Sequence, residues 1–116
     1  MKNKVICFDI DNVICKTLKN NYKKSKPKKR AIELINRLYD NGYIIKILTA
    51  RHMGRTNDNI IKANKLGYKK TYKQLKKWGV KFHKLFITKP SFDYYIDDKA
   101  YNFNSKWIDV VKKKLL

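Results

Sequence analysis

Four short apolar runs, separated by longer segments with a helical pattern, constrain the fold of this chain most strongly. They are residues 4–10 (KVICFDI), 43–48 (YIIKIL), 85–88 (LFIT) and 94–96 (YYI). Their length and their content of β-branched or aromatic residues are typical of buried strands. Strands that alternate with helical crossovers pair in parallel. The pattern therefore predicts an α/β fold built on a central parallel sheet.

The segments between the runs predict helices on both faces of that sheet. A first helix follows Pro27 and ends at Asn41-Gly42, where Gly42 suits a left-handed cap. Its apolar face comprises Ala31, Leu34, Ile35 and Leu38. Further helices are predicted at 56–66 (ending at Gly67), at 71–78 (ending at Gly79) and from about 104 to the end. Helices on both faces give three layers, so we predict a three-layer, Rossmann-like fold.

Length and apolar content fit one domain over residues 1–116. The chain has 116 residues, of which 43% are hydrophobic, enough for one packed core. No apolar stretch is long enough to span a membrane, and the N-terminus has no signal-peptide core. The two cysteines do not form a disulfide framework or a zinc motif, and Cys7 is expected in the core. These features favour a cytoplasmic protein with no membrane partner.

Polar side chains follow the predicted strands where ligands bind in an open parallel sheet. Asp9 and Asp11 end the first strand, 49–51 (Thr-Ala-Arg) ends the second, Lys89 follows the third and 97–98 (Asp-Asp) follows the fourth. The carboxyl ends of parallel strands lie at one rim, so these groups are expected to meet there. Crowded carboxylates require a cation, and an all-oxygen site suits Mg²⁺. Carboxylates, a metal ion and a Lys/Thr pair indicate phosphoryl transfer.

The same residues resemble the four motifs of the haloacid dehalogenase-like (HAD) phosphohydrolases. FDIDNV resembles motif I, ILTAR resembles motif II, Lys89 in TKP resembles the motif III lysine, and YYIDDKA resembles the acidic motif IV. The motifs come in the family's order between residues 5 and 100. The segment KPSFDYYIDDKA also resembles the small capsule- or polysaccharide-biosynthesis phosphatases.

The resemblance implies a role for each matched residue. Asp9 would be the nucleophile that forms an aspartyl-phosphate, and Asp11 would be the general acid and base. Mg²⁺ would be held by the Asp9 side chain, the Asp11 backbone carbonyl and Asp97, with Asp98 as a partner in its outer shell. The phosphoryl group would be held by Thr49, Ala50 and Lys89. Arg51 is either a phosphate or substrate contact or a solvated turn residue, and Lys84 is a second candidate for the phosphate-binding lysine.

Two residues depart from the usual motif I, and the inserted segments are short. Asn12 replaces the commoner Gly and tolerates a left-handed backbone, and Val13 replaces the commoner Thr. No stretch is long enough for a cap domain, so the site is expected to be open or covered by a neighbouring subunit in a homo-oligomer. We predict a Mg²⁺-dependent phosphomonoesterase that acts on a small phosphorylated metabolite such as a sugar phosphate.

The charge keeps a second class of function open. Basic residues outnumber acidic ones 29 to 9, giving a net charge of +20, which attracts polyanions. However, 25 of the 29 are Lys, which an AT-rich coding sequence places on any solvated surface. The stretch 16–30 is dense in Lys and is expected to be a long loop beside the nucleophile. The alternatives are a polynucleotide or nucleotide phosphatase and a basic nucleic-acid-binding module.

Overall fold

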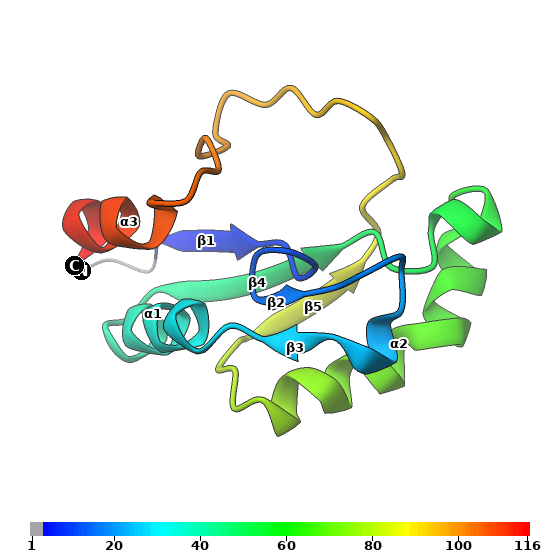
Figure 1. The fold of residues 1–116 in the computed structure, drawn as a ribbon, viewed down its shortest axis with the longest axis horizontal. Helices are drawn as coiled ribbons and strands as arrows, with labels where there is room; N and C mark the ends of the chain where they lie inside the picture. Colours follow the sequence, from blue (N-terminus) through cyan, green and yellow to red (C-terminus); the bar gives the residue numbers. More distant parts are fainter. Residues whose placement is uncertain (1–3) are drawn as a thin grey trace.

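The core element is a three-stranded parallel sheet, seen in a computed structural model that describes residues 4–116. Its order is β1 (Val5–Phe8), β4 (Ile44–Thr49) and β5 (Lys84–Ile87), as in Figure 1. The register aligns Phe8 with Ile47 and Thr49 with Ile87, so the three strands end at one rim. Three of the four predicted strands, and their parallel arrangement, are confirmed.

Three helices pack against one face of this sheet. They are α1 (Lys29–Asp40), α2 (Ile60–Lys77) and α3 (Trp107–Leu115). Buried residues of all three helices share one core with the sheet residues that face them: Phe8, Ile45, Ile47 and Leu85 from the sheet, Leu34, Ile35 and Leu38 from α1, Leu75 from α2 and Trp107 from α3. The helix predicted after Pro27 is confirmed, and Gly42 takes the expected positive φ of 93°.

The opposite face of the sheet differs from the prediction, because it has no helical layer within residues 4–116. Val5 and Cys7 of β1 are exposed on it, and Leu48 and Phe86 are only half-buried. The prediction of three layers is therefore not met, and Cys7 is not a core residue. The cause is the connection from β5 to α3, residues 88–106, which contains no helix to cover this face.

The predicted fourth strand at 94–96 is not formed. Residues 88–106 instead make an open arch over the side of the sheet where β1 lies (Figure 1). Tyr94 is 89% exposed and Ile96 is 98% exposed, so neither is packed as a strand residue would be. In the described sheet β1 pairs only with β4, which leaves its other edge free.

The two helices predicted at 56–66 and 71–78 are one continuous helix, α2. Gly67 does not end this helix. The absence of a side chain at Gly67 instead leaves space for the ring of His52. A Cβ atom at Gly67 would lie 2.3 Å from Cδ2 of His52. The helix ends where predicted, before Gly79, whose φ is 77°.

The segment 12–28, which we call the flap, is more ordered than the predicted loop. It contains a short antiparallel pair, β2 (Cys15–Lys16) with β3 (Lys26–Pro27), and a 3-10 turn, η1 (Tyr22–Lys24). A second 3-10 turn, η2 (Gly54–Thr56), precedes α2. No helix within the described residues is long and apolar enough to cross a membrane.

Candidate active site

Asp9 lies at the carboxyl end of β1 and is the centre of the site. Its Oδ1 accepts a hydrogen bond from the backbone amide of Ile10 at 2.8 Å. Burial raises the pKa of Asp9 above its ordinary value, and the charge of Lys89 and the Ile10 amide only partly offset this effect. Asp9 is therefore a partly desolvated carboxylate, a suitable state for a nucleophile.

Lys89, rather than Lys84, is the lysine next to Asp9. The Nζ atom of Lys89 lies 3.5 Å from Oδ2 of Asp9. Lys84 is exposed at the amino end of β5, where it aligns with Lys46. Ligands bind at the carboxyl ends of parallel strands, and Lys84 lies at the opposite end of β5. Of the two lysines, only Lys89 therefore lies at the rim with Asp9.

Thr49 ends β4, the strand between those that carry Asp9 and Lys89 at their ends, and Ala50 follows it. Thr49 is 1% exposed, and its Oγ1 accepts a hydrogen bond from the amide of Arg51 at 3.2 Å. Lys89 is tied to the same strand end by its backbone, because its amide donates to the carbonyl of Thr49 at 3.3 Å. The residues expected to hold a phosphoryl group therefore lie at one rim.

The Asp11 side chain is paired with a buried arginine, Arg51. Nη2 of Arg51 lies 2.9 Å from Oδ1 of Asp11, and Nε lies 3.0 Å from Oδ2. Thr17 adds a further hydrogen bond, from its hydroxyl to Oδ1 at 2.6 Å. Arg51 is only 2% exposed, so it is not a solvated turn residue. In this conformation its charge is directed at Asp11 rather than toward a substrate.

Asp97 and Asp98 are not brought to the other carboxylates. Both are exposed on the arch, and Asp97 bonds only to neighbours in sequence: Tyr95 at 3.2 Å and the amide of Lys99 at 2.9 Å. That amide lowers the pKa of Asp97. Within the described residues no three His, Cys, Asp or Glu side chains come close enough together to hold a metal ion. The expected metal site of Asp9, Asp11 and Asp97 is therefore not assembled here, because the strand that would carry Asp97 is missing.

The rim encloses a cleft of about 480 Å³. Its walls come from the ends of all three strands and from the flap. They include Asp9, Asp11, Asn12, Tyr22, Thr49, Ala50, Arg51, Lys89 and Phe92. A larger hollow on α2 is lined by Ile60, Ile61, Leu66, Tyr68 and lysines, without a carboxylate group. Only the first hollow combines a nucleophile with cations, so it is the candidate site.

Three contacts of this region were not predicted from the sequence. Tyr22 places its ring 4.7 Å from the Arg51 guanidinium carbon, and Gln74 joins Arg51 to the flap. His52 has a left-handed φ of 64° and packs its ring edge-on against Tyr22. No local sequence pattern marks these contacts, because they join segments far apart in the chain. Asn12 does take the left-handed angle predicted for it, with φ 66°.

The comparisons with known proteins give the fold but no function. No protein-family profile matches the chain, and no curated protein matches it. Among solved structures, the chain is similar to a structural-genomics target from Vibrio cholerae, whose title names no function. The TM-score is 0.79 at 25% identity, over 96% of this chain and 98% of that chain. The class established by fold and comparison is a mixed α/β protein with a parallel sheet.

Proposed function

We propose that this protein is a phosphomonoesterase of the HAD-like class, in which Asp9 is the nucleophile. The observation that carries the proposal is the pairing of a partly desolvated Asp9 with Lys89 at 3.5 Å, at the rim where Thr49 ends the neighbouring strand. A carboxylate beside a fixed cation can attack an electrophile that carries negative charge, and a phosphate monoester is such an electrophile. We propose a small phosphorylated metabolite such as a sugar phosphate as the substrate, in the cytoplasm, because the cleft has a volume of about 480 Å³.

The proposed reaction has two steps. An Asp9 oxygen attacks phosphorus while the bond from phosphorus to the ester oxygen breaks, and that oxygen leaves with a proton from Asp11. Water then attacks the aspartyl-phosphate, Asp11 takes the water proton, and inorganic phosphate leaves Asp9. Lys89 and Thr49 would stabilise the negative charge on the transferring group during both steps.

Mg²⁺ dependence is a separate part of the proposal, because the described conformation does not form the whole site. Lys89 and Arg51 already neutralise Asp9 and Asp11, and Asp97 is on the arch. We propose that Mg²⁺ binding requires the arch to move toward the free edge of β1 and bring Asp97 to Asp9. Mg²⁺ should then raise the melting temperature of the wild type, and Asp97→Asn should remove most of this rise. Asp93→Asn, on the same arch, is the matched control; equal loss in both variants would contradict a specific role for Asp97.

The direct test is hydrolysis of para-nitrophenyl phosphate and a panel of sugar phosphates, with and without Mg²⁺. Wild type should turn over, and Asp9→Asn should lose on the order of 10⁴-fold or more, as nucleophile removal does elsewhere. Because Asn is nearly isosteric with Asp, its circular dichroism spectrum should match that of the wild type. Equal rates in the two proteins, or no turnover on any ester, would refute the nucleophilic role of Asp9.

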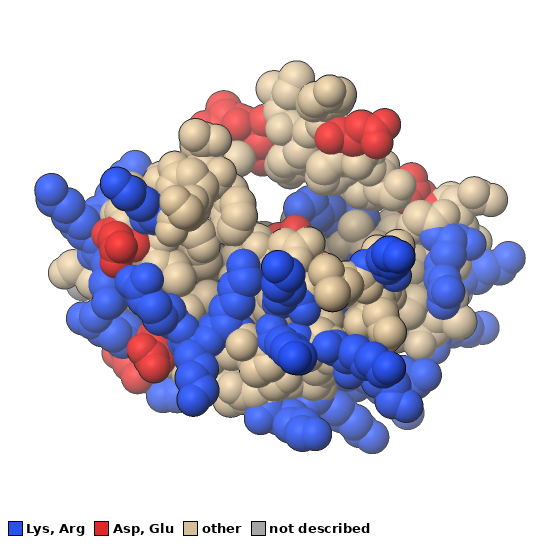
Figure 2. Space-filling model, viewed as in Figure 1, with Lys and Arg blue, Asp and Glu red and all other residues tan. Residues whose placement is uncertain are grey.

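A second candidate function is favoured by how the charges are distributed. The segments 12–32 and 59–92 contain no acid but eight and ten basic residues, respectively. The flap and α2 come from these segments and are joined by the Gln74–Tyr22 hydrogen bond. Figure 2 shows Lys and Arg across the lower part of the face where Figure 1 places both elements. The flap and α2 therefore present basic side chains without acidic ones.

This acid-free surface beside the cleft fits a polynucleotide that carries a terminal phosphate. The inactive Asp9→Asn protein should bind a 3′-phosphorylated single-stranded oligonucleotide with a steep salt dependence. Replacing Lys70 and Lys73 of α2 with Glu should weaken this binding more than replacing Lys112 and Lys113 of α3. Equal weakening by the two double substitutions would show that binding depends on net charge alone, and it would contradict this second candidate function.

A further inference from the structure

The side chain of Arg51 connects the candidate acid–base residue to the flap. Two of its nitrogens contact the two Asp11 oxygens, a bidentate pairing that fixes both position and orientation. The pair is unequal in exposure, because the Arg51 side chain is 2% exposed and that of Asp11 is 21% exposed. Removing the carboxylate would leave a buried charge unpaired, so the contact is costly to open.

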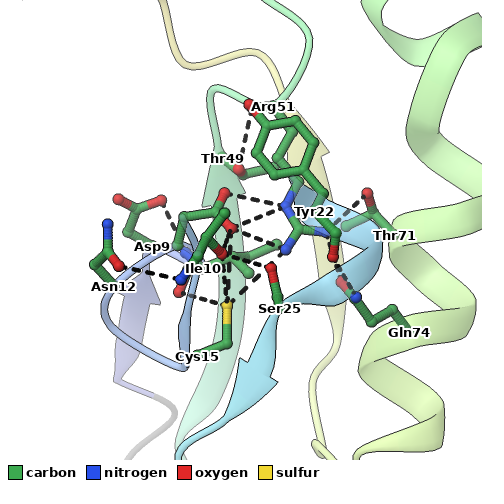
Figure 3. Close-up of polar contacts among 12 residues, drawn as sticks. Asp9, Ile10, Asn12, Cys15, Tyr22, Ser25, Thr49, Arg51, Thr71 and Gln74 are labelled. Atoms are coloured by element: carbon green, nitrogen blue, oxygen red, sulfur yellow. Dashed lines mark hydrogen bonds and ion pairs between the residues drawn. The ribbon is translucent and has the colours of Figure 1, made fainter. Parts of the chain in front are cut away.

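The third nitrogen of the guanidinium is directed away from Asp11, toward α2. Nη1 donates to Oε1 of Gln74 at 2.6 Å, and it lies 3.5 Å from the hydroxyl of Thr71. The same Gln74 side chain donates through Nε2 to the carbonyl of Tyr22 at 2.8 Å. Arg51 is thus linked through one amide to the backbone of the flap (Figure 3).

Tyr22 closes this network from above the guanidinium. Its ring lies 4.7 Å from Cζ of Arg51, within the range of a cation–π contact. The ring also packs edge-on against His52 at a centroid distance of 5.1 Å. Within residues 4–116, the hydrogen bonds and ring contacts that join the flap tip (18–25) to α2 and to the residues after β4 all involve Tyr22. The docking of the tip therefore depends on one residue, and that residue packs on Arg51.

The Asp11 oxygens accept several hydrogen bonds in this docked arrangement. Oδ1 accepts from Arg51, Thr17 and Cys15, whereas Oδ2 accepts from Arg51 alone and keeps a lone pair that can carry a proton. The direction of that lone pair is set by the Arg51 contact, so proton transfer at Asp11 depends on where Arg51 is held. The buried guanidinium has little freedom to move while Tyr22 and Gln74 hold it from the other sides.

We propose that Arg51 is a positioning residue that orients Asp11 and docks the flap through Tyr22, so that flap release and proton transfer at Asp11 are coupled. This inference rests on the proposed phosphatase function, because only that function gives Asp11 a proton to transfer. Arg51 acts through Asp11 and does not itself contact the phosphorus or its ligands. It is thus distinct from Lys89, which faces the nucleophile.

Flap docking can be measured without any enzymatic activity, because the flap is rich in trypsin sites. Lys19, Lys23 and Lys24 are exposed on it, and their cleavage can be followed by mass spectrometry under native conditions. We expect Arg51→Gln and Tyr22→Leu to increase the rate of cleavage at these lysines about tenfold. Arg55→Gln, which removes an exposed arginine of η2, should leave the rate unchanged. An unchanged rate in Arg51→Gln would overturn the docking role.

The role of Arg51 in positioning Asp11 is tested by measuring kcat and KM separately for Arg51 variants. Arg51→Gln should lower kcat by about 10²-fold, with a changed pH profile and little change in KM, because general acid–base catalysis contributes on this scale. Arg51→Lys should recover part of kcat, because an ammonium group can pair with Asp11 but cannot bond both oxygens in a fixed plane. A raised KM with an unchanged kcat would make Arg51 a substrate contact and overturn the inference.

The two tests separate the inference from the function on which it rests. If the wild-type protein hydrolyses no ester, the phosphatase proposal fails, and the Asp11 part of the inference fails with it. The tryptic cleavage experiment still decides whether Arg51 docks the flap. If the wild type is active and the cleavage rates do not change, the phosphatase proposal stands and the inference fails.

Discussion

The pairs Asp9/Asp11 and Asp97/Asp98 look alike in the sequence but have different surroundings in the structure. Each pair follows a short apolar run. Asp9 and Asp11 lie at the end of a paired strand and contact Lys89 and Arg51. Asp97 and Asp98 lie on an exposed arch, and the bonds of Asp97 are to its neighbours in sequence. We call the first the sheet-held pair and the second the arch pair.

The difference shows that a carboxylate pair takes a fixed position in a candidate site only when the strand before it is paired and packed in the sheet. β1 pairs with β4 over four residues, and Phe8 is buried in the core directly before Asp9. The run before the arch pair, Tyr94–Tyr95–Ile96, has no strand partner in the described sheet. A short apolar run has little tendency to form a strand by itself, because strands are stabilised by pairing and packing.

The largest expected effect compares one acid from each region. Asp11→Asn should lower kcat by about 10²- to 10⁴-fold, the usual contribution of a general acid–base group. Asp93→Asn, an exposed acid on the arch, should change kcat less than twofold. Steady-state kinetics on the same ester measures both variants. Equal effects would show that the fixed position of Asp11 gives it no special role.

The next effect compares two lysines at opposite ends of β5. Lys89→Met should lower kcat by about 10²-fold or more, since it removes a fixed charge beside the reacting group. Lys84→Met should have no measurable effect, because Lys84 lies at the other end of the strand. The same kinetic assay tests both lysines, and a larger loss for Lys84 would reverse the assignment.

A smaller effect concerns the helix that supports the sheet-held pair. Gly→Ala within a helix usually stabilises a protein, but at Gly67 the new Cβ would meet the His52 ring at 2.3 Å. We expect Gly67→Ala to destabilise the fold by about 1–3 kcal/mol, as overpacking does. Urea unfolding measures this change. In a His52→Ala background the same substitution should stabilise the protein, and destabilisation there would rule out the His52 clash as the cause.

The smallest effect is the pH dependence of stability due to Asp9. Because burial raises the pKa of Asp9, the folded chain binds this proton more tightly than the unfolded chain does. The stability that this bound proton contributes is complete below the pKa of Asp9 in the unfolded chain. It is lost as the pH rises through the pKa of Asp9 in the folded chain. Asp9→Asn should therefore melt at a higher temperature than wild type at pH 7, and the gap should vanish at about pH 3. The 35% exposure of the Asp9 side chain keeps the effect modest.

Local patterns predicted the parts of the site that depend on paired strands. The runs at 4–10, 43–48 and 85–88 each gave a strand, and their parallel order brought Asp9, Thr49 and Lys89 to one rim. The turn at Asn12 was also predictable, since Asn tolerates the left-handed angle. The arch was not predictable from 94–96, because the same apolar residues can be a strand or an exposed segment.

The sequence by itself determined the α/β class, the three parallel strands and the position of the sheet-held pair at a strand end. These features follow from periodicity and local conformational preference, which act over a few residues. Only the tertiary structure decided that Gly67 lies within a helix, that Arg51 pairs with Asp11 and Tyr22, and that the arch pair stays apart. Each of these depends on contacts between segments distant in the chain, and the free energy of such contacts is set by burial and geometry that exist only after folding.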